Sequence, residues 1–248
     1  MSLVVALSAC RHGDKNDPVE TVIPDGTVNV AFHSLYEGQD FAEGTVYLSS
    51  LGYRIRIDDF RNYFSMVQLH RSDGALVDVK DFYLADFYRA DPTLTATAPP
   101  GTYDSLFFNI GIPAAYNTGV DPSIYRSVHA LSVVSAQDMF WGWNAGYIFL
   151  KFDGKLDSTG VDTAELIEPF AFHCGDDPLF TSVHIPLQNA TVMSNGTKSI
   201  DVDIHVDRIL KSEEDTIDLA TDYITHTSGN VELAQRIMRN YSRSFVAR

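Results

Sequence analysis

Short stretches in which apolar and polar residues alternate recur through most of this chain, and they restrict it to a sheet-rich fold. In residues 27–33, Val28, Val30 and Phe32 share one parity and polar or small residues share the other. This is the pattern of a half-buried strand. Short groups of Gly, Pro, Asn and Asp separate the stretches, as turns do. The pattern predicts strands at residues 27–33, 45–49, 63–70, 76–83, 103–112, 145–152, 169–174, 182–187 and 198–206.

Eight or nine short strands without intervening helices predict an all-β fold, an antiparallel β-sandwich. Aromatic residues make up 12% of the 248 residues, which favours sheet over a helical bundle. Neither an internal repeat nor a linker rich in Pro, Gly and Ser divides the sequence after residue 26. We therefore expect residues 27–248 to form a single domain.

The charge balance argues against nucleic acid as a partner. Lys and Arg number 18 against 33 Asp and Glu, which gives a net charge of −15. Such a chain would be repelled by a phosphate backbone. Sequence motifs of hydrolases, metalloproteases and nucleotide-binding enzymes are also missing. We therefore expect a protein that is not an enzyme.

The N-terminus carries a short apolar run that ends in Leu7-Ser8-Ala9-Cys10. The run is too short to span a bilayer but matches the apolar part of a signal peptide. Its end looks like a bacterial lipobox, in which the thiol of Cys10 is lipidated. We interpret residues 1–10 as a signal peptide and lipobox remnant and residues 11–26 as a polar tether. The expected location is the cell envelope, as an outer-membrane lipoprotein facing the periplasm or the cell surface, with the lipid anchor as its only membrane contact.

The C-terminal end has a different periodicity. From Asn230, apolar residues recur at intervals of three and four, and three arginines take the opposite side. This spacing predicts an amphipathic helix over residues 230–245 that covers the bottom of the sandwich. The apolar positions are Ala234, Ile237, Met238, Tyr241 and Phe245.

Four strings occur in an order that resembles the MbnP-like family of copper-binding proteins. They are Phe-Asn-Ile-Gly-Ile-Pro at 108–113, Met-Phe-Trp-Gly-Trp-Asn-Ala-Gly-Tyr-Ile-Phe-Leu at 139–150, Phe-His-Cys-Gly at 172–175 and Asn-Tyr-Ser-Arg-Ser-Phe at 240–245. The resemblance implies an immunoglobulin-like sandwich outside the cytoplasm, often a lipoprotein in Bacteroidetes-type bacteria, with a copper site. In some relatives a tryptophan near the metal is oxidised to kynurenine by a di-haem, peroxidase-like partner enzyme.

Imidazoles are good ligands for copper, and the residues and the resemblance together select among eight histidines. His173 is the first candidate, because the resemblance singles it out and Gly175 beside it permits a close approach. His33 follows, since it precedes a turn where many relatives have a histidine. Trp141 and Trp143 supply an indole, or a kynurenine derived from it. His205 is a weaker candidate, on a strand whose polar face also carries three aspartates.

Each candidate also has a structural interpretation. A solvent-facing histidine, a core tryptophan and a solvated acidic strand face would give the same patterns. Cys174 has the parity of Phe172, which predicts a buried, inert thiol. His12, His70, His129 and His226 are interpreted as surface residues. The alternative function is a glycan- or protein-binding surface module without metal, with an aromatic face that includes Phe82, Tyr83, Phe87 and Tyr88; a third is a structural lipoprotein.

Overall fold

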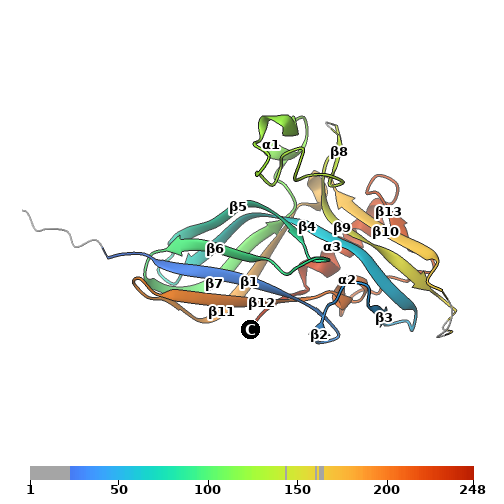
Figure 1. Cartoon of the computed structure of the whole chain (residues 1–248), viewed down its shortest axis with the longest axis horizontal. Coiled ribbons are helices and arrows are strands. Elements are labelled where there is room, and N and C mark those ends of the chain that lie inside the picture. Colours follow the sequence, from blue (N-terminus) through green and yellow to red (C-terminus); the bar gives the residue numbers. More distant parts are fainter. Residues whose placement is uncertain (1–22, 143, 160, 162–164) are drawn as a thin grey trace, which may run out of the picture.

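The computed structural model describes residues 23–142, 144–159, 161 and 165–248, and strands dominate it (Figure 1). Within these residues the strands form two sheets, one of five strands and one of nine. Apolar side chains from both sheets meet in a continuous buried core. The all-β sandwich expected from the alternating pattern is therefore confirmed.

In the five-stranded sheet, the first long strand of the chain pairs with one of the last. The neighbour order is β14-β12-β1-β2, and β6 pairs with β1. β1 is antiparallel to β6 but parallel to β12, so the expectation of antiparallel pairing fails for this pair, because two strands so far apart in sequence are not joined by a hairpin. The strands are β1 (Gly26–Tyr36), β2 (Gln39–Asp40), β6 (Thr93–Ala98), β12 (Thr197–His205) and β14 (Phe245–Ala247).

The nine-stranded sheet is built around one long strand, β4. The neighbour order is β11-β7-β4-β9-β10-β13, while β3 and β5 pair with β4 and β8 pairs with β9. The strands are β3 (Val46–Leu48), β4 (Arg54–Arg71), β5 (Leu76–Asp86), β7 (Gly101–Ile110), β8 (Phe140–Gly142), β9 (Gly146–Asp157), β10 (Glu168–Gly175), β11 (Thr181–Val192) and β13 (Ile224–Thr225).

The predicted C-terminal helix is present but shorter than expected. α3 (Val231–Ser242) begins after Asn230, whose side chain accepts a hydrogen bond from the Leu233 amide. Phe245 lies in β14, where it pairs with Ile204, so the expected helical end at 245 is wrong. Further helical segments are α1 (Ala114–Asn117), α2 (Asp207–Leu210) and 3-10 turns at Pro122–Ile124 and Asp177–Leu179. None of the helices in the described part of the chain has the length and hydrophobicity to cross a membrane.

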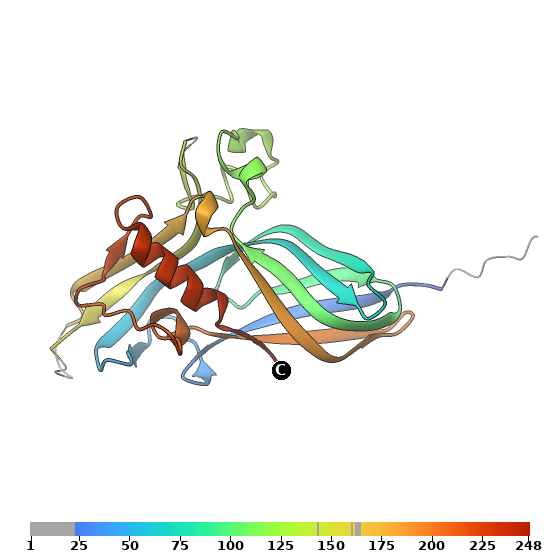
Figure 2. The same ribbon diagram turned by 180° about the vertical axis from the view of Figure 1, so that it is seen from behind.

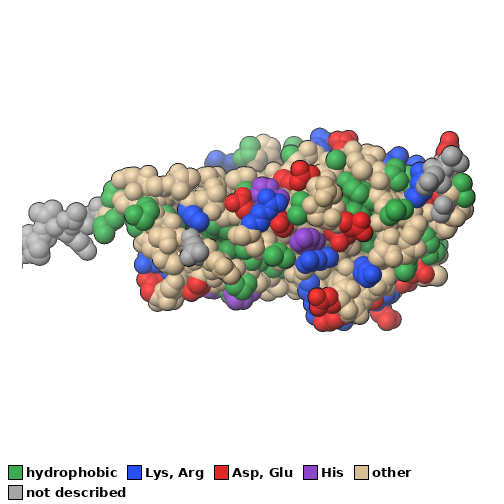
Figure 3. Space-filling model, turned by 90° about the horizontal axis from the view of Figure 1, so that it is seen from below, with side chains coloured by type: hydrophobic (Ala, Val, Ile, Leu, Met, Phe, Trp, Pro, Cys, Tyr) green, Lys and Arg blue, Asp and Glu red, His purple; other side chains and the backbone are tan. Residues whose placement is uncertain are grey.

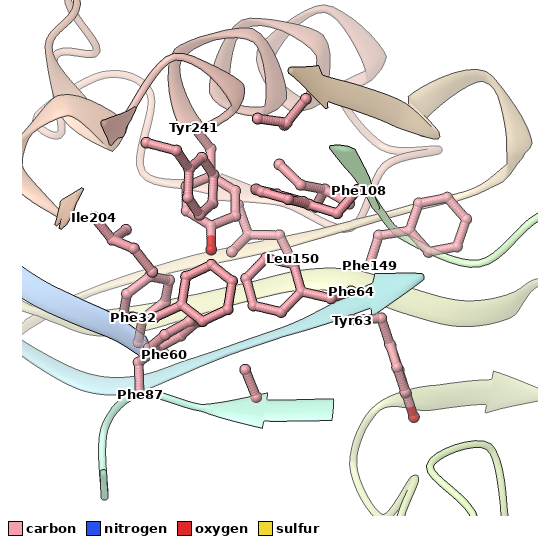
Figure 4. Close-up of a cluster of buried hydrophobic side chains, with 14 of the residues drawn as sticks. Phe32, Phe60, Tyr63, Phe64, Phe87, Phe108, Phe149, Leu150, Ile204 and Tyr241 are labelled. Carbon is pink, nitrogen blue, oxygen red and sulfur yellow. The ribbon is translucent and has the colours of Figure 1, made fainter. Parts of the chain in front are cut away.

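Two different elements cover the inner face of β4. Phe64 stacks on Phe32 of β1, with ring centroids 4.8 Å apart. Phe60 instead meets Tyr241 of α3 edge to face, at 5.8 Å. Figure 4 shows these rings in one cluster, and Figure 2 shows α3 lying across the part of the nine-stranded sheet that β1 and β12 leave uncovered. The helix thus completes the core where the second sheet ends.

The segment from α1 to β8 stands out from the opposite, outer side of the nine-stranded sheet (Figure 1). It is fixed there by two buried tyrosines. The hydroxyl of Tyr63 donates to the Ala130 carbonyl at 3.2 Å, and that of Tyr147 donates to the Leu131 carbonyl at 2.6 Å. β8 pairs with β9 at the same place, which holds Trp141 beside the end of β10.

Candidate metal centre

Two histidines meet on the outer face of the nine-stranded sheet. Phe172 and Cys174 of β10 are fully buried, so the alternation directs His173 outward, on the side away from the core. β13 pairs with β10, and His226 follows β13 directly. The two imidazole rings touch edge to face, with centroids 4.5 Å apart and planes at 81°.

The loop that carries His226 is tied to the end of β10. The hydroxyl of Thr227 donates to the His173 carbonyl at 3.1 Å and accepts from the Gly175 amide at 2.9 Å. Thr227 is buried, and its φ is 59°, a left-handed conformation that non-glycine residues seldom adopt. This clamp holds the loop so that His226 lies beside His173. The position of His226 is therefore preorganised by the chain itself.

Trp141 forms a wall of the adjoining pocket. Its ring lies so close to the backbone of Gly175 that a Cβ there would be 2.7 Å from the indole and 2.5 Å from the Tyr147 carbonyl oxygen. Only glycine fits this position. The pocket has a volume of about 490 Å³ and is lined by Trp141, Asn144, Ala145, Asp176, His226, Thr227 and Ser228.

A row of charges lies on the same sheet face behind His173. Nε2 of His173 is 2.9 Å from Oδ2 of Asp153, in β9. The ammonium group of Lys151 lies 3.8 Å from the same oxygen and 3.0 Å from Asp59. Asp59 in turn receives two hydrogen bonds from Arg61. These side chains are largely shielded from solvent, so their charges are weakly screened.

The protonation behaviour of His226 favours a neutral donor. Partial burial and the nearby ring of His173 lower the pKa of His226 below its ordinary value of 6.5. His226 therefore stays neutral, with a free lone pair, to lower pH than a histidine with the ordinary pKa. Cys174 is different: it is fully buried on the core side, and burial raises the pKa of its thiol far above the ordinary value. A buried thiol, as the parity predicted, is what the structure contains.

The structure does not bring His33 to His173. Phe32 points into the core from the five-stranded sheet and Phe172 points into it from the other sheet. His33, which follows Phe32, and His173, which follows Phe172, therefore project from the outer faces of different sheets. His33 has its own partner, Asp201 of β12, at 2.9 Å from Nε2.

His205 shares the outer face of the five-stranded sheet with His33. Burial and the nearby charge of Arg208 lower the pKa of His205. Between the two histidines, Asp203 accepts a hydrogen bond from Arg248 at 2.5 Å, so this carboxylate is already paired. Figure 3 looks from the side on which β12 and the C-terminus lie in Figure 1, and shows acidic, basic and histidine side chains intermixed there.

Two residues proposed from the sequence, Trp143 and Cys10, lie outside the described residues.

The four aromatic residues proposed for a glycan- or protein-binding face do not lie together. Phe87 is buried in the core, whereas Phe82 and Tyr83 line an open groove of about 850 Å³ with Tyr125 and His129. Tyr88 lies elsewhere, in a pocket rich in carboxylates.

Sequence patterns missed His226. It lies in a loop, where no periodicity marks a side chain as facing a site, and only the pairing of the two-residue strand β13 with β10 brings it to His173.

Within the described ranges, no group of three or more His, Cys, Asp or Glu side chains is arranged to hold a metal ion. The site thus offers a pair of imidazoles rather than a closed ligand cage.

Comparison with known proteins agrees with this fold. A family model described as MbnP matches residues 25–231, most of the chain. A solved structure, MbnP from Methylosinus trichosporium, superposes with a TM-score of 0.53 at 17% sequence identity, covering 79% of this chain and 80% of that one. No curated protein matches the chain significantly. The extent of the family match establishes that this chain belongs to the MbnP family.

Proposed function

We propose that this protein binds copper as its cargo, for storage, delivery or sensing, between His173 and His226, with Trp141 closing the pocket. The observation that carries the proposal is the contact of these two imidazoles at 4.5 Å beside an indole, in a chain of the MbnP family. Imidazole is a ligand that suits copper, and a low coordination number suits Cu(I).

The residues present fit such a cargo. A metal-bound imidazole commonly donates its other N–H to a carboxylate, and Asp153 is in that position at His173. The second oxygen of Asp153, Oδ1, is buried and has no hydrogen-bond partner among the described residues. An unbalanced buried acceptor raises the negative potential at the site. A cation held by His173 would lower this electrostatic cost.

The same proposal includes a setting in the cell envelope. It is supported by the lipobox-like Leu7-Ser8-Ala9-Cys10, and the acyl chains on Cys10 would anchor the protein by burying methylenes at about 0.8 kcal/mol each. Changing Cys10→Ser should move the protein from the membrane fraction to the soluble fraction of its host. Recovery of both forms in the membrane fraction would contradict the anchor.

Trp141 or Trp143 is the proposed site of conversion to kynurenine by a di-haem, peroxidase-like partner. The support is the position of Trp141 in the wall of the pocket that also contains His226. The conversion would raise the mass of a peptide that contains both tryptophans by about 4 Da. Mass spectrometry of protein purified from its host tests this, and fragmentation of the peptide identifies the modified residue.

Copper titration of matched histidine variants tests the site. We expect His173→Ala and His226→Ala each to abolish stoichiometric binding, and His184→Ala, a histidine on β11 in the same sheet, to leave it unchanged. Because only an imidazole with a free lone pair can bind copper, protonation competes with the metal, and the affinity should fall as the pH drops below about 6.5, the ordinary histidine value. Because the pKa of His226 is lowered, the part of the fall in copper affinity that is due to His226 should occur at lower pH.

Two results would contradict this assignment. Copper binding that survives both His173→Ala and His226→Ala would exclude the site. Loss of binding in His33→Ala alone would place a ligand on the other sheet, as the sequence pattern proposed. The glycan-binding alternative has weaker support, because Trp141 is half-buried against Gly175 instead of forming an exposed aromatic row.

A further inference from the structure

We propose that Asp153 is a positioning residue for His173: it fixes the imidazole tautomer and so decides which nitrogen is offered to a metal. This inference rests on the proposed function for the identity of the metal. Its structural part concerns the metal-free protein and can be tested without copper.

The hydrogen bond itself determines the tautomer. Asp153 Oδ2 lies 2.9 Å from Nε2 of His173. A carboxylate can only accept a hydrogen bond, so in the neutral imidazole Nε2 carries the hydrogen and Nδ1 keeps its lone pair. Without this partner, histidine usually populates both tautomers. Asp153 therefore commits Nδ1 to be the donor atom for a metal.

The strands that flank β10 hold this geometry from both sides. Asp153 lies on β9, which pairs with β10 in antiparallel register, and His226 follows β13, which pairs with the other edge of β10. The ring of His173 thus has the carboxylate on one side and the second imidazole on the other. Rotation of the ring would break the first contact and disturb the second.

The charges next to Asp153 pair mainly with one another and leave its carboxylate to His173. Lys151 lies 3.8 Å from Asp153 but 3.0 Å from Asp59, which also binds Arg61. Lys151 is thus engaged mainly with Asp59, and its charge still faces Asp153. The Asp153 carboxylate has one oxygen bound to His173 and the other unpaired, so its one polar side-chain partner at hydrogen-bond distance, among the described residues, is the histidine.

The chain contains a matched control in the pair His33 and Asp201. Nε2 of His33 lies 2.9 Å from Asp201 Oδ1, the same distance as in the first pair. This pair is on the other sheet and more exposed, with 33% of the His33 side chain accessible against 16% for His173. A change of Asp201 should therefore alter a histidine tautomer without affecting the proposed copper site.

The experiment measures both quantities on the same proteins. Long-range proton–nitrogen NMR spectra of ¹⁵N-labelled, metal-free protein report the tautomer of each histidine. We expect His173 to be protonated on Nε2 in the wild type and to populate both tautomers in Asp153→Asn, since an amide can donate as well as accept. The copper affinity of that variant should fall about 10- to 100-fold. Asp201→Asn should shift the His33 signals alone and leave the affinity unchanged.

A second variant, Asp153→Ala, removes the hydrogen-bonding group altogether and so controls for hydrogen bonds made by the introduced amide. Thermal unfolding monitored by circular dichroism verifies the fold of each variant. An unchanged His173 tautomer in both Asp153 variants would overturn the inference, as would a changed tautomer with unchanged copper affinity. If the wild type binds no copper, the proposed function fails, and the tautomer of the metal-free protein still decides whether Asp153 positions His173.

Discussion

At the scale of the residue, a single glycine determines how the candidate site is closed. Trp141 can lie against β10 only because Gly175 has no side chain, while the backbone of the same glycine binds Thr227 and so holds the loop of His226. Gly175 therefore connects two parts of the site that are far apart in sequence. A larger residue at this position would therefore disturb both the Trp141 ring and the loop of His226.

We expect Gly175→Ala to displace the Trp141 ring and to lower the free energy of unfolding by about 1 to 3 kcal/mol, because the added methyl group has no space. Chemical denaturation and the tryptophan emission spectrum measure the two effects. Gly229→Ala, in the loop that carries His226, is the control, since a Cβ there meets nothing within 4 Å. Equal stability of both variants would mean that Trp141 moves aside without cost.

At the scale of the element, α3 acts as a replacement for the missing part of the second sheet. Ile237 is fully buried, and Tyr241 packs on Phe60 and donates a hydrogen bond to Asn62 at 2.8 Å.

We expect Ile237→Ala to lower the free energy of unfolding by about 2 to 5 kcal/mol, through lost burial and a cavity. Val231→Ala, at an exposed position of the same helix, should stay within about 0.5 kcal/mol. Thermal unfolding compares them; a small effect at Ile237 would make the helix peripheral.

The polar side of α3 is fixed to the preceding loop by Arg236. Its guanidinium donates to Asp215 at 2.7 and 2.8 Å and to Asp222 at 2.7 Å. The hydrogen bonds from Arg236 to Asp215 lower the pKa of Asp215 below its ordinary value of 3.8. The stability that the pair contributes is therefore fully present above pH 3.8 and is lost as the pH falls through the lowered pKa.

We accordingly expect Asp215→Asn to lower the free energy of unfolding by about 1 to 3 kcal/mol at neutral pH. The difference from wild type should shrink in acid below the ordinary pKa, where the wild-type carboxyl also becomes neutral. Glu214→Gln, which affects the exposed pair with Arg243, should cost at most about 1 kcal/mol. Denaturant titrations over a range of pH check both; a pH-independent difference would point to packing instead of charge.

At the scale of the whole molecule, the sequence predicted elements whose side chains follow one simple period. Val28, Val30 and Phe32 alternate without interruption and are all buried. The first half of β4 was missed, because the register shifts between Ile57 and Asp59 and the alternation shifts with it. His226 was missed for a different reason: its role depends on a pairing between strands about 50 residues apart, which no local pattern encodes.

The parallel pairing of β1 with β12 constrains the time at which the molecule can become stable. β1 needs β12, which begins at Thr197, as its neighbour, and Thr27 pairs with Thr197 itself. During synthesis, one of the two edges of β1 stays unpaired until about four-fifths of the 248 residues have been made. A nascent chain of this kind needs protection from aggregation for most of its synthesis, and fragments that end before Thr197 should remain protease-sensitive.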